Sequence, residues 1–326
     1  MKHLEKVLKT FLKIISTITV VGRVSSVVIF IKGSFRPLTS DLRHLLWEGI
    51  CRMDVNEKKY LEEKATKIRK HIINMIGKAG SGHPGGSLSA ADILSVLYFK
   101  KLRVDPADPK NPCRDRFILS KGHAAPVLYA ALAEKGFFPI EELMTLRKIN
   151  SKLQGHPDVK TTSGIDMSTG SLGQGFSVAV GLALGGIMDQ ADYRVYVMLG
   201  DGEIQEGIVW EAAMLASHYK LDNLTAIMDY NGLQIDGKTE DVVSPEPVAD
   251  KWRAFGWNVL EIDGHDMEEI DQAFDKAASF KGQPTMIIAK TIKGKGVSYM
   301  ENCADWHGKA LNTDEKDKAL AELIGN

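Results

Sequence analysis

Apolar residues recur every three or four positions along residues 57–75. This spacing is typical of an amphipathic helix that buries one face, so we expect a helix over this segment. A second helix is expected over residues 89–102, with Ser87 or Ser89 as its N-terminal cap. Both helices precede the first strand-like run of the chain.

Beyond these helices, short β-rich runs alternate with segments of helical pattern. Strands are expected at residues 117–120, 194–199, 224–229, 258–262 and 285–289. Helices are expected at residues 124–135, 172–188, 208–219, 247–255, 266–279 and 316–323. The run VYVML at 195–199 is apolar at every position, as a parallel strand covered on both faces must be. The alternation predicts an α/β fold, a doubly wound parallel sheet flanked by helices, forming one domain over residues 53–326.

Composition narrows the class of protein. The 326 residues are 44% hydrophobic and 25% charged, with a net charge of −1, which argues against a dedicated nucleic-acid binder. The three cysteines, Cys51, Cys113 and Cys303, form no CxxC pair. We therefore expect no disulfide framework and no structural zinc site, and a cytoplasmic location.

The first 52 residues differ from the rest of the chain. They carry nine Lys or Arg against three Asp or Glu, so the remainder is acidic overall. Lys13 and Arg23 interrupt the apolar stretch at 11–31, and an arginine at the centre of a membrane helix costs about 2.5–3.5 kcal/mol. We expect an N-terminal extension that is a non-native upstream translation, with Met53 as the initiator and no membrane partner. A membrane-associating extension and a secretory signal are the alternatives.

Two motifs with oxygen ligands follow neighbouring expected strands. Asp201 comes just after the strand at 194–199, and Asn231 follows the strand at 224–229. Parallel strands end at one edge of a sheet, so a carboxylate, an amide and the Leu233 carbonyl can meet there. Such hard ligands suit Mg²⁺ or Ca²⁺.

A phosphate is expected beside this metal. Gly202 lets the backbone approach it closely, and the helix beginning near Glu206 adds a favourable dipole. Either motif alone is more simply interpreted as an ordinary turn. The two motifs together, each after a strand, favour a metal and diphosphate site.

Four histidines lie beside glycine: His83, His123, His156 and His307. Imidazole binds anionic or hydroxylated ligands and moves protons near neutral pH, and glycine turns place it at loop tips. One such histidine alone is more often structural, but four favour a convergent catalytic pocket. Their spacing fits no zinc-binding pattern.

The helix expected at 172–188 is rich in glycine and alanine. Glycine inside a helix costs about 0.8–1.0 kcal/mol relative to alanine, so close packing must compensate for it. That packing is expected either within the domain or across a subunit interface.

These motifs resemble the transketolase family of thiamine diphosphate-dependent enzymes. The resemblance covers nearly everything after Met53 and keeps the family order of seven segments. They are SGHPGG (81–86), LSKGHAA (119–125), QGHPD (154–158), STGSLGQG (168–175), GDGEIQEG (200–207), DYNGLQIDG (229–237) and TIKGKGVSYMEN…WHGKAL (291–311). The resemblance implies the thiamine diphosphate-binding fold, and transfer of a two-carbon ketol unit between sugar phosphates.

The resemblance also implies roles for individual residues. The metal, Mg²⁺ or Ca²⁺, would be held by Asp201, Asn231 and the Leu233 carbonyl. The residues implied to contact thiamine diphosphate are His123, Gly170, Ser171, Leu172, Gly202, Glu206, Asn231, Ile235 and His307.

The resemblance to transketolases assigns the catalytic roles to the histidines. His123 and His307 would lie beside the thiazolium ring and the diphosphate, and His83, His156 and His307 would contact the sugar. Glu206 matches a buried glutamate that helps to link paired active sites in the family.

Transketolases continue for as long again beyond the segment that corresponds to His307. That further part carries the glutamate that activates the cofactor and most groups that bind the sugar phosphate. The resemblance therefore implies one chain of a split transketolase, inactive by itself. Its partner would be a separately encoded C-terminal subunit with the pyrimidine-binding domain, in a homodimer of heterodimers.

Three alternatives remain open on the sequence. The chain could be the cofactor-binding subunit of a 2-oxoacid dehydrogenase, although the segments around His83 and His123 suit a sugar phosphate better. It could belong to a deoxyxylulose-phosphate synthase, which the set of histidines fits less well. It could also be a non-catalytic binding module.

Overall fold

The computed structural model describes residues 53–325, together with the short antiparallel pair β1 (Phe30–Ile31) and β2 (Ser34–Phe35). Contacts divide the chain into two units, Met1–Arg52 and Met53–Asn326. The expectations for the upstream extension, including the start at Met53, lie outside the described residues. No helix in the described part is long and apolar enough to cross a membrane.

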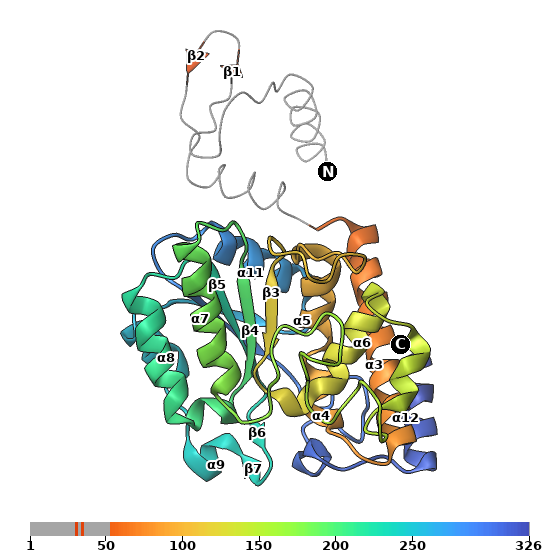
Figure 1. The fold of residues 1–326 in the computed structure, drawn as a ribbon. Helices are drawn as coiled ribbons and strands as arrows, with labels where there is room; N and C mark the ends of the chain where they lie inside the picture. Colours follow the sequence, from red (N-terminus) through yellow and green to blue (C-terminus); the bar gives the residue numbers. More distant parts are fainter. Residues whose placement is uncertain (1–29, 32–33, 36–52, 326) are drawn as a thin grey trace, which may run out of the picture. The chain divides into compact units, whose positions relative to one another are not determined.

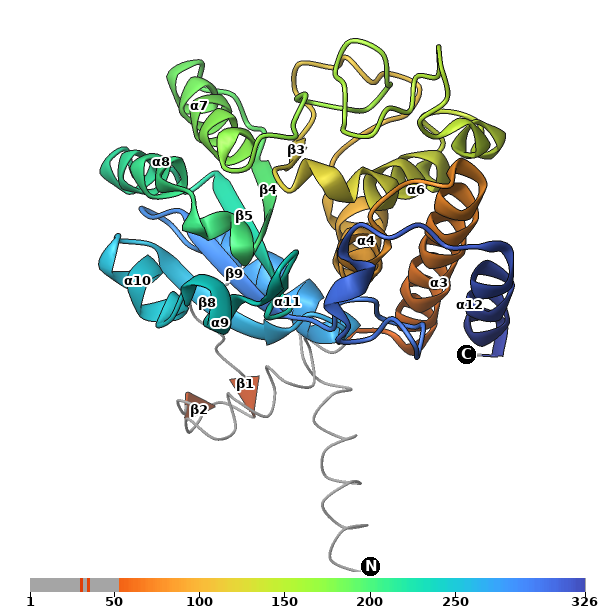
Figure 2. The same cartoon turned by 90° about the horizontal axis from the view of Figure 1, so that it is seen from below.

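A five-stranded sheet forms the centre of the second unit (Figures 1 and 2). All neighbouring strands are parallel, in the order β3-β4-β5-β9-β8. The predicted parallel α/β fold is confirmed, and each expected strand lies within one residue of the observed one. The strands are β3 (Arg116–Leu119), β4 (Val195–Gly200), β5 (Leu224–Tyr230), β8 (Asn258–Asp263) and β9 (Thr285–Lys290).

Both faces of the sheet are covered, because successive side chains of a strand point to opposite faces. In β4, Val195, Val197 and Leu199 belong to one hydrophobic core, and Tyr196 and Met198 to the other. The first core is closed by α7 (Gln174–Met188), α8 (Gly207–His218) and α10 (Val248–Ala254). The second is closed by α3 (Val55–Ala79), α5 (Ala91–Val96), α6 (Ala125–Lys135), α11 (Met267–Ser279) and α12 (Thr313–Gly325).

Local signals explain where α3 begins and ends. The Asp54 side chain accepts hydrogen bonds from the free backbone N–H groups of Asn56 and Glu57. The helix stops at Gly80, whose φ of 64° lies in the left-handed region that favours glycine.

The helix expected over 89–102 is wrong in its start and its continuity. Pro84 occupies the first turn of α4 (Pro84–Ser89), because a proline fits where no backbone donor is needed. Neither predicted serine caps a helix: Ser87 donates to the His83 carbonyl and Ser89 to the Asp229 carboxylate. The chain breaks at Ala90 and continues as α5 and a π-helical turn, Leu97–Lys101.

Two smaller differences affect the site. The expected helix at 172–188 begins at Gln174, after Gly173 at a φ of 77°, so Leu172 lies in the preceding loop. A hairpin not anticipated from the pattern, β6 (Leu233–Gln234) with β7 (Gly237–Lys238), follows β5. It leads into the short helix α9 (Thr239–Val243).

Candidate active site

The candidate site lies at the carboxyl edge of the sheet, where the turns after β3, β4, β5 and β9 leave together. Gly200 pairs with Asp229 in the β4–β5 register, so the turn after β4 begins beside the end of β5. The parallel arrangement therefore brings together residues that are far apart in the sequence, as predicted for Asp201 and Asn231.

Asp201 is a buried carboxylate surrounded by backbone donors. Its Oδ2 accepts from the N–H groups of Asn231 (3.0 Å) and Gly232 (2.5 Å), and its Oδ1 from Gly202 N–H (2.8 Å). Burial, and then the nearby Asp229 charge, raise the pKa of Asp201 to about 6. A buried carboxylate that is incompletely compensated in this way fits a cation site.

The other two expected metal ligands lie beside Asp201. Asn231 donates from Nδ2 to Asp229 Oδ2 (3.3 Å), and its Oδ1 accepts from the Leu233 N–H (3.2 Å). The Leu233 carbonyl accepts from the Lys293 ammonium at 2.9 Å, so it already faces a positive charge. One carboxylate, one amide and one carbonyl fit a hard divalent cation.

A buried ion pair that the sequence reasoning missed supports this corner. Lys121 and Asp229 are 2% and 0% exposed in their side chains and form a salt bridge. Asp229 also accepts from the hydroxyls of Ser89 and Thr291, and the Lys121 ammonium donates to the Gly86 carbonyl. Burial raises the pKa of Asp229, but the Lys121 charge and these hydrogen bonds outweigh it and lower the pKa.

Lys293 is a second buried cation that sequence reasoning passed over. It lies in the turn after β9 and is 2% exposed. Its ammonium contacts the Leu233 carbonyl and His307 Nδ1, both at 2.9 Å. Burial lowers its pKa to about 8 despite the carboxylates of Asp201 and Asp229. Its position within the TIKGKG segment was the available sequence signal.

Three of the four predicted histidines form a compact cluster. The ring centroids of His123 and His307 are stacked at 5.1 Å, and His83 lies 5.3 Å from His123 and 5.6 Å from His307. Burial is the largest cause that lowers each pKa, to about 4 for His83, 2 for His123 and 3 for His307, and neighbouring cations add to it. All three imidazoles are therefore neutral near pH 7 and able to donate and accept hydrogen bonds.

His156 lies at the rim of this cluster. It is exposed, and a Cβ added at Gly170 would lie 3.1 Å from its ring. Arg147, which the sequence reasoning did not single out, contacts His83 on the same side, with Nη2 3.4 Å from Nδ1. Burial and the Arg147 charge lower the pKa of His156.

Glycines permit the close approach of these loops. A Cβ at Gly85 would lie 2.9 Å from the Trp306 carbonyl and 3.0 Å from the Lys293 side chain. At Gly122 it would lie 2.6 Å from the Thr169 hydroxyl. These two glycines are therefore required by tight packing between loops.

The remaining expected cofactor contacts differ in burial. Ser171 and Ile235 are exposed, while Leu172 and Gly202 are half-buried. Glu206, matched to a buried family residue, is exposed on this chain and precedes α8.

The buried carboxylate of the segment GDGEIQEG (200–207) is Glu203, which accepts from Ser120 and from the Gly173 and Gly200 N–H groups. Glu203 thus joins three loops of the site and was also missed.

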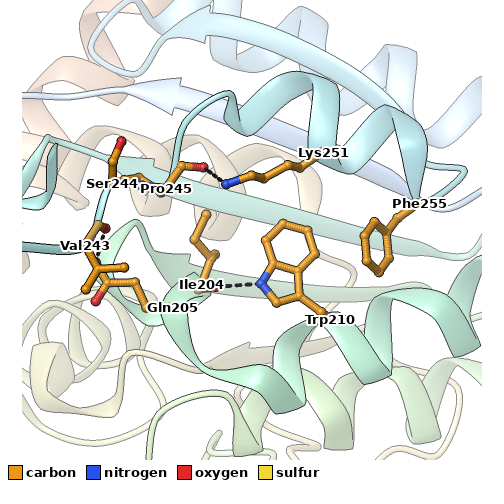
Figure 3. A pocket seen from close by; sticks show the side chains of 8 residues that line it. All are labelled: Ile204, Gln205, Trp210, Val243, Ser244, Pro245, Lys251 and Phe255. Atoms are coloured by element: carbon orange, nitrogen blue, oxygen red, sulfur yellow. Dashed lines mark hydrogen bonds between the residues drawn. The ribbon is translucent and has the colours of Figure 1, made fainter.

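A separate hollow lies between α8 and α10, beside the end of α9 (Figure 3). It has a volume of about 350 Å³, and Trp210 and Phe255 form part of its wall. Gln205, in its wall, donates to Gln234 of the hairpin (2.8 Å) and to the Val243 carbonyl of α9 (2.7 Å). None of the predicted site residues lines it.

Comparison with known proteins identifies the family. Residues 61–325 match the family model described as transketolase, thiamine diphosphate binding domain. The chain is 51% identical to the 6-deoxy-6-sulfo-D-fructose transketolase subunit of Clostridium sp. (strain MSTE9), over 81% of this chain and 96% of that one. It is 47% identical to an apulose-4-phosphate transketolase subunit of Phocaeicola vulgatus, over 81% and 93% of the two chains.

Solved structures agree with this comparison. The transketolase of Campylobacter jejuni superposes with a TM-score of 0.78 at 38% identity, over 83% of this chain and 43% of that one. The chain thus spans less than half the length of the transketolases of known structure that it matches. Its motifs, its parallel sheet and these matches agree: the chain belongs to the transketolase family and corresponds to its N-terminal, thiamine diphosphate-binding section.

Proposed function

We propose that the chain is one subunit of a split transketolase, which transfers a two-carbon ketol unit between sugar phosphates. One observation carries this proposal. The chain covers 96% and 93% of two relatives named as transketolase subunits, at 51% and 47% identity, but 44% of the human transketolase. The partner would be a separately encoded C-terminal subunit carrying the pyrimidine-binding domain, and the assembly a homodimer of heterodimers.

The donor set at the sheet edge supports a divalent metal, Mg²⁺ or Ca²⁺. Asp201, the Asn231 amide and the Leu233 carbonyl would hold it, and Lys293 would release the carbonyl to neutralise the diphosphate. The Gly202 backbone would lie against the diphosphate. The incomplete compensation of the buried Asp201 carboxylate favours this assignment.

Thiamine diphosphate supplies, when bound, a nucleophilic thiazolium carbon for the two-carbon transfer. Gly170, Ser171, Leu172 and Ile235 would line it. The exposure of Ser171 and Ile235 on this chain is consistent with a cofactor enclosed only after the partner docks.

The histidines would act on the sugar. His123 and His307 would lie beside the thiazolium and diphosphate, and His83 and His156 would contact sugar oxygens. Since His83, His123 and His307 are neutral near pH 7, they can donate a hydrogen bond to an oxygen and accept a proton from a hydroxyl. The names of the two subunit relatives refer to ketoses with an anionic group, which suits a site rich in cations and imidazoles.

The surface of α7 and α8 would receive the partner subunit. Met188, Met214 and Leu215 are 75%, 56% and 45% exposed on these two helices. Gly181 and Gly185 of α7 have no neighbour within 4 Å of an added Cβ, so a partner helix can approach closely. α7 begins next to the loop of residues 170–172, which makes this surface continuous with the cofactor site. The exposed Glu206 would then be buried in the assembly.

The test is reconstitution of the chain with a candidate C-terminal subunit. We expect turnover of xylulose 5-phosphate with ribose 5-phosphate only when both subunits, thiamine diphosphate and Mg²⁺ are present. The variant Asp201→Asn should abolish turnover, while Asp250→Asn on the exposed face of α10 serves as the matched control. Appreciable turnover by the chain alone would overturn the split-subunit proposal.

A further inference from the structure

Arg147 lies outside the recognised motifs, but specific contacts hold both its backbone and its side chain. It lies before the loop that carries His156, and its φ of 58° is in the left-handed region, which is costly for a side chain other than glycine. Its backbone N–H donates to the Leu153 carbonyl at 2.8 Å, which holds this conformation. Such backbone strain is retained where the surrounding structure requires it.

The guanidinium is anchored as well as the backbone. Nη1 donates to the Ser81 hydroxyl at 2.6 Å. A Cβ added at Gly155 would lie 3.2 Å from Cζ and Nε of Arg147, so glycine leaves the room that the planar group occupies. Among the described residues, no carboxylate forms a salt bridge with it. Its other terminal nitrogen, Nη2, lies 3.4 Å from His83 Nδ1.

The chemistry of this contact determines which His83 nitrogen carries the proton. A guanidinium has only N–H donors and stays charged in proteins. His83 Nδ1 must therefore be the acceptor, and the single proton of the neutral ring resides on Nε2. The contact is long for a hydrogen bond, but the positive charge at this end of the ring also opposes a proton on Nδ1.

The other end of the His83 ring faces the site. A Cβ at Gly308 would lie 3.5 Å from His83 Nε2, and the His123 and His307 rings are the aromatic neighbours. The charged or titratable groups that act on His83 are Arg147, His156 and Lys293, together with His123 and His307. The first three lower its pKa, and burial is the largest cause.

We propose that Arg147 is a positioning residue that holds His83 in the Nε2–H tautomer, so that this nitrogen donates a hydrogen bond to an oxygen of the sugar substrate. The sugar part of this inference rests on the proposed function. The tautomer part concerns this chain alone, and it is measured without cofactor, metal or partner.

The first experiment measures the tautomer directly. In the full chain labelled with ¹⁵N-histidine, long-range ¹H–¹⁵N correlations distinguish protonated from unprotonated ring nitrogens, and His83→Gln identifies the His83 signals. We expect an unprotonated Nδ1 in the wild type near pH 7. In Arg147→Met the His83 signals should move toward the tautomer mixture of free imidazole, and the pKa of His83 should rise from about 4 toward 6.5.

Three further variants test whether Arg147 sets the tautomer of His83. Ser81→Ala removes only the anchor of the guanidinium and should shift the His83 signals in the same direction by less. Arg147→Lys keeps a cationic donor and should restore part of the wild-type spectrum. Arg253→Met, at an exposed arginine of α10, should leave the spectrum unchanged. A proton on Nδ1 in the wild type, or an unchanged spectrum in both Arg147→Met and Ser81→Ala, would overturn the inference.

Reconstituted enzyme separates this inference from the proposed function. Arg147→Met should lower kcat/KM by about 10- to 100-fold, the range for losing a hydrogen bond that involves a charged group, with partial recovery in Arg147→Lys. Equal turnover in wild type and Arg147→Met would refute the role of the Nε2–H donor in the reaction. Absence of transketolase activity in the wild-type assembly would refute the proposed function, while the tautomer measurement would still decide the positioning role.

Discussion

At the scale of single residues, the site depends on charges that are buried and matched to one another. The pair Lys121–Asp229 is nearly inaccessible, and its carboxylate also holds the Asn231 amide. Close by, three imidazoles are kept neutral by burial and by cations. Charges of this kind are compensated by specific partners, so changing one partner has a larger effect than changing both.

The buried pair leads to a prediction about stability. Asp229→Asn and Lys121→Met each leave an unpaired buried group, and each should lower the free energy of unfolding by about 3–5 kcal/mol. The double variant removes both charges and should lose less than the sum of the single losses. Urea unfolding of the four proteins measures this coupling, and strictly additive losses would show that the two side chains do not act as a pair.

The neutral histidines lead to a prediction about pH. Their pKa values in the folded chain lie below the unfolded value of about 6.5, so unfolding takes up protons below that pH. The contribution of these histidines to the free energy of unfolding is therefore fully present above pH 6.5. It is lost progressively as the pH falls toward their pKa values in the folded chain, the highest of which is about 4. In His83→Gln the slope of unfolding free energy against pH should be smaller by about one proton in this range. An unchanged slope in His83→Gln would contradict this prediction.

At the scale of elements, two glycines have opposite surroundings, one closely packed and one on an open helix face. Gly122 lies in a 3₁₀ turn, Gly122–Ala124, pressed against Thr169, whereas Gly181 lies on the open face of α7. The same residue type therefore serves tight packing within the domain in one element and an open surface in the other.

This contrast gives a paired prediction. Gly181→Ala should raise the unfolding free energy of the isolated chain by about 0.5–1 kcal/mol, because alanine favours a helix and meets no neighbour. Gly122→Ala should destabilise the chain, because the new Cβ would lie 2.6 Å from the Thr169 hydroxyl. Thermal unfolding of both variants checks the direction of each change. A stabilised Gly122→Ala would mean that the loop has room that the structure does not show.

The same surface of α7 can be tested for its partner. Gly181→Leu should leave the isolated chain folded but weaken its association with the C-terminal subunit, because a large side chain blocks close helix approach. Analytical ultracentrifugation of the mixed subunits measures this. Ile149→Leu, at a 93% exposed position of another loop, is the control. Unchanged association in Gly181→Leu would exclude this helix face from the interface.

At the scale of the whole molecule, the sheet brings the metal ligands and the cations to one edge, so ligand binding should couple to stability. Mg²⁺ with thiamine diphosphate should raise the midpoint of thermal unfolding, and a ligand at 100 times its Kd adds about 2.7 kcal/mol. Either ligand alone should do much less, because each provides part of the charge that the other needs. Asp201→Asn should abolish the shift, and Asp250→Asn should retain it. Equal shifts in both variants would place the ligands elsewhere.

The sequence by itself determined the five strands of the sheet, most of the helices and the order of the motifs. Short β-rich runs between segments of helical pattern predicted all five strands of the sheet, and the run at 195–199 is apolar at every position because that strand is covered on both faces. The adjacency of Asp201 and Asn231 also followed, since both come after neighbouring parallel strands. Local exceptions, such as the helix start at Pro84, arose where one residue outweighed the periodic pattern.

Only the tertiary structure decided which side chains meet across the site. Lys121 and Asp229 are 108 positions apart, and Arg147 and His83 are 64 positions apart. No periodicity of the chain encodes such pairs, because they form only when separate loops converge at the carboxyl edge of the sheet. The motifs thus indicated where chemistry resides, while burial and these long-range contacts set the charge and orientation of each group.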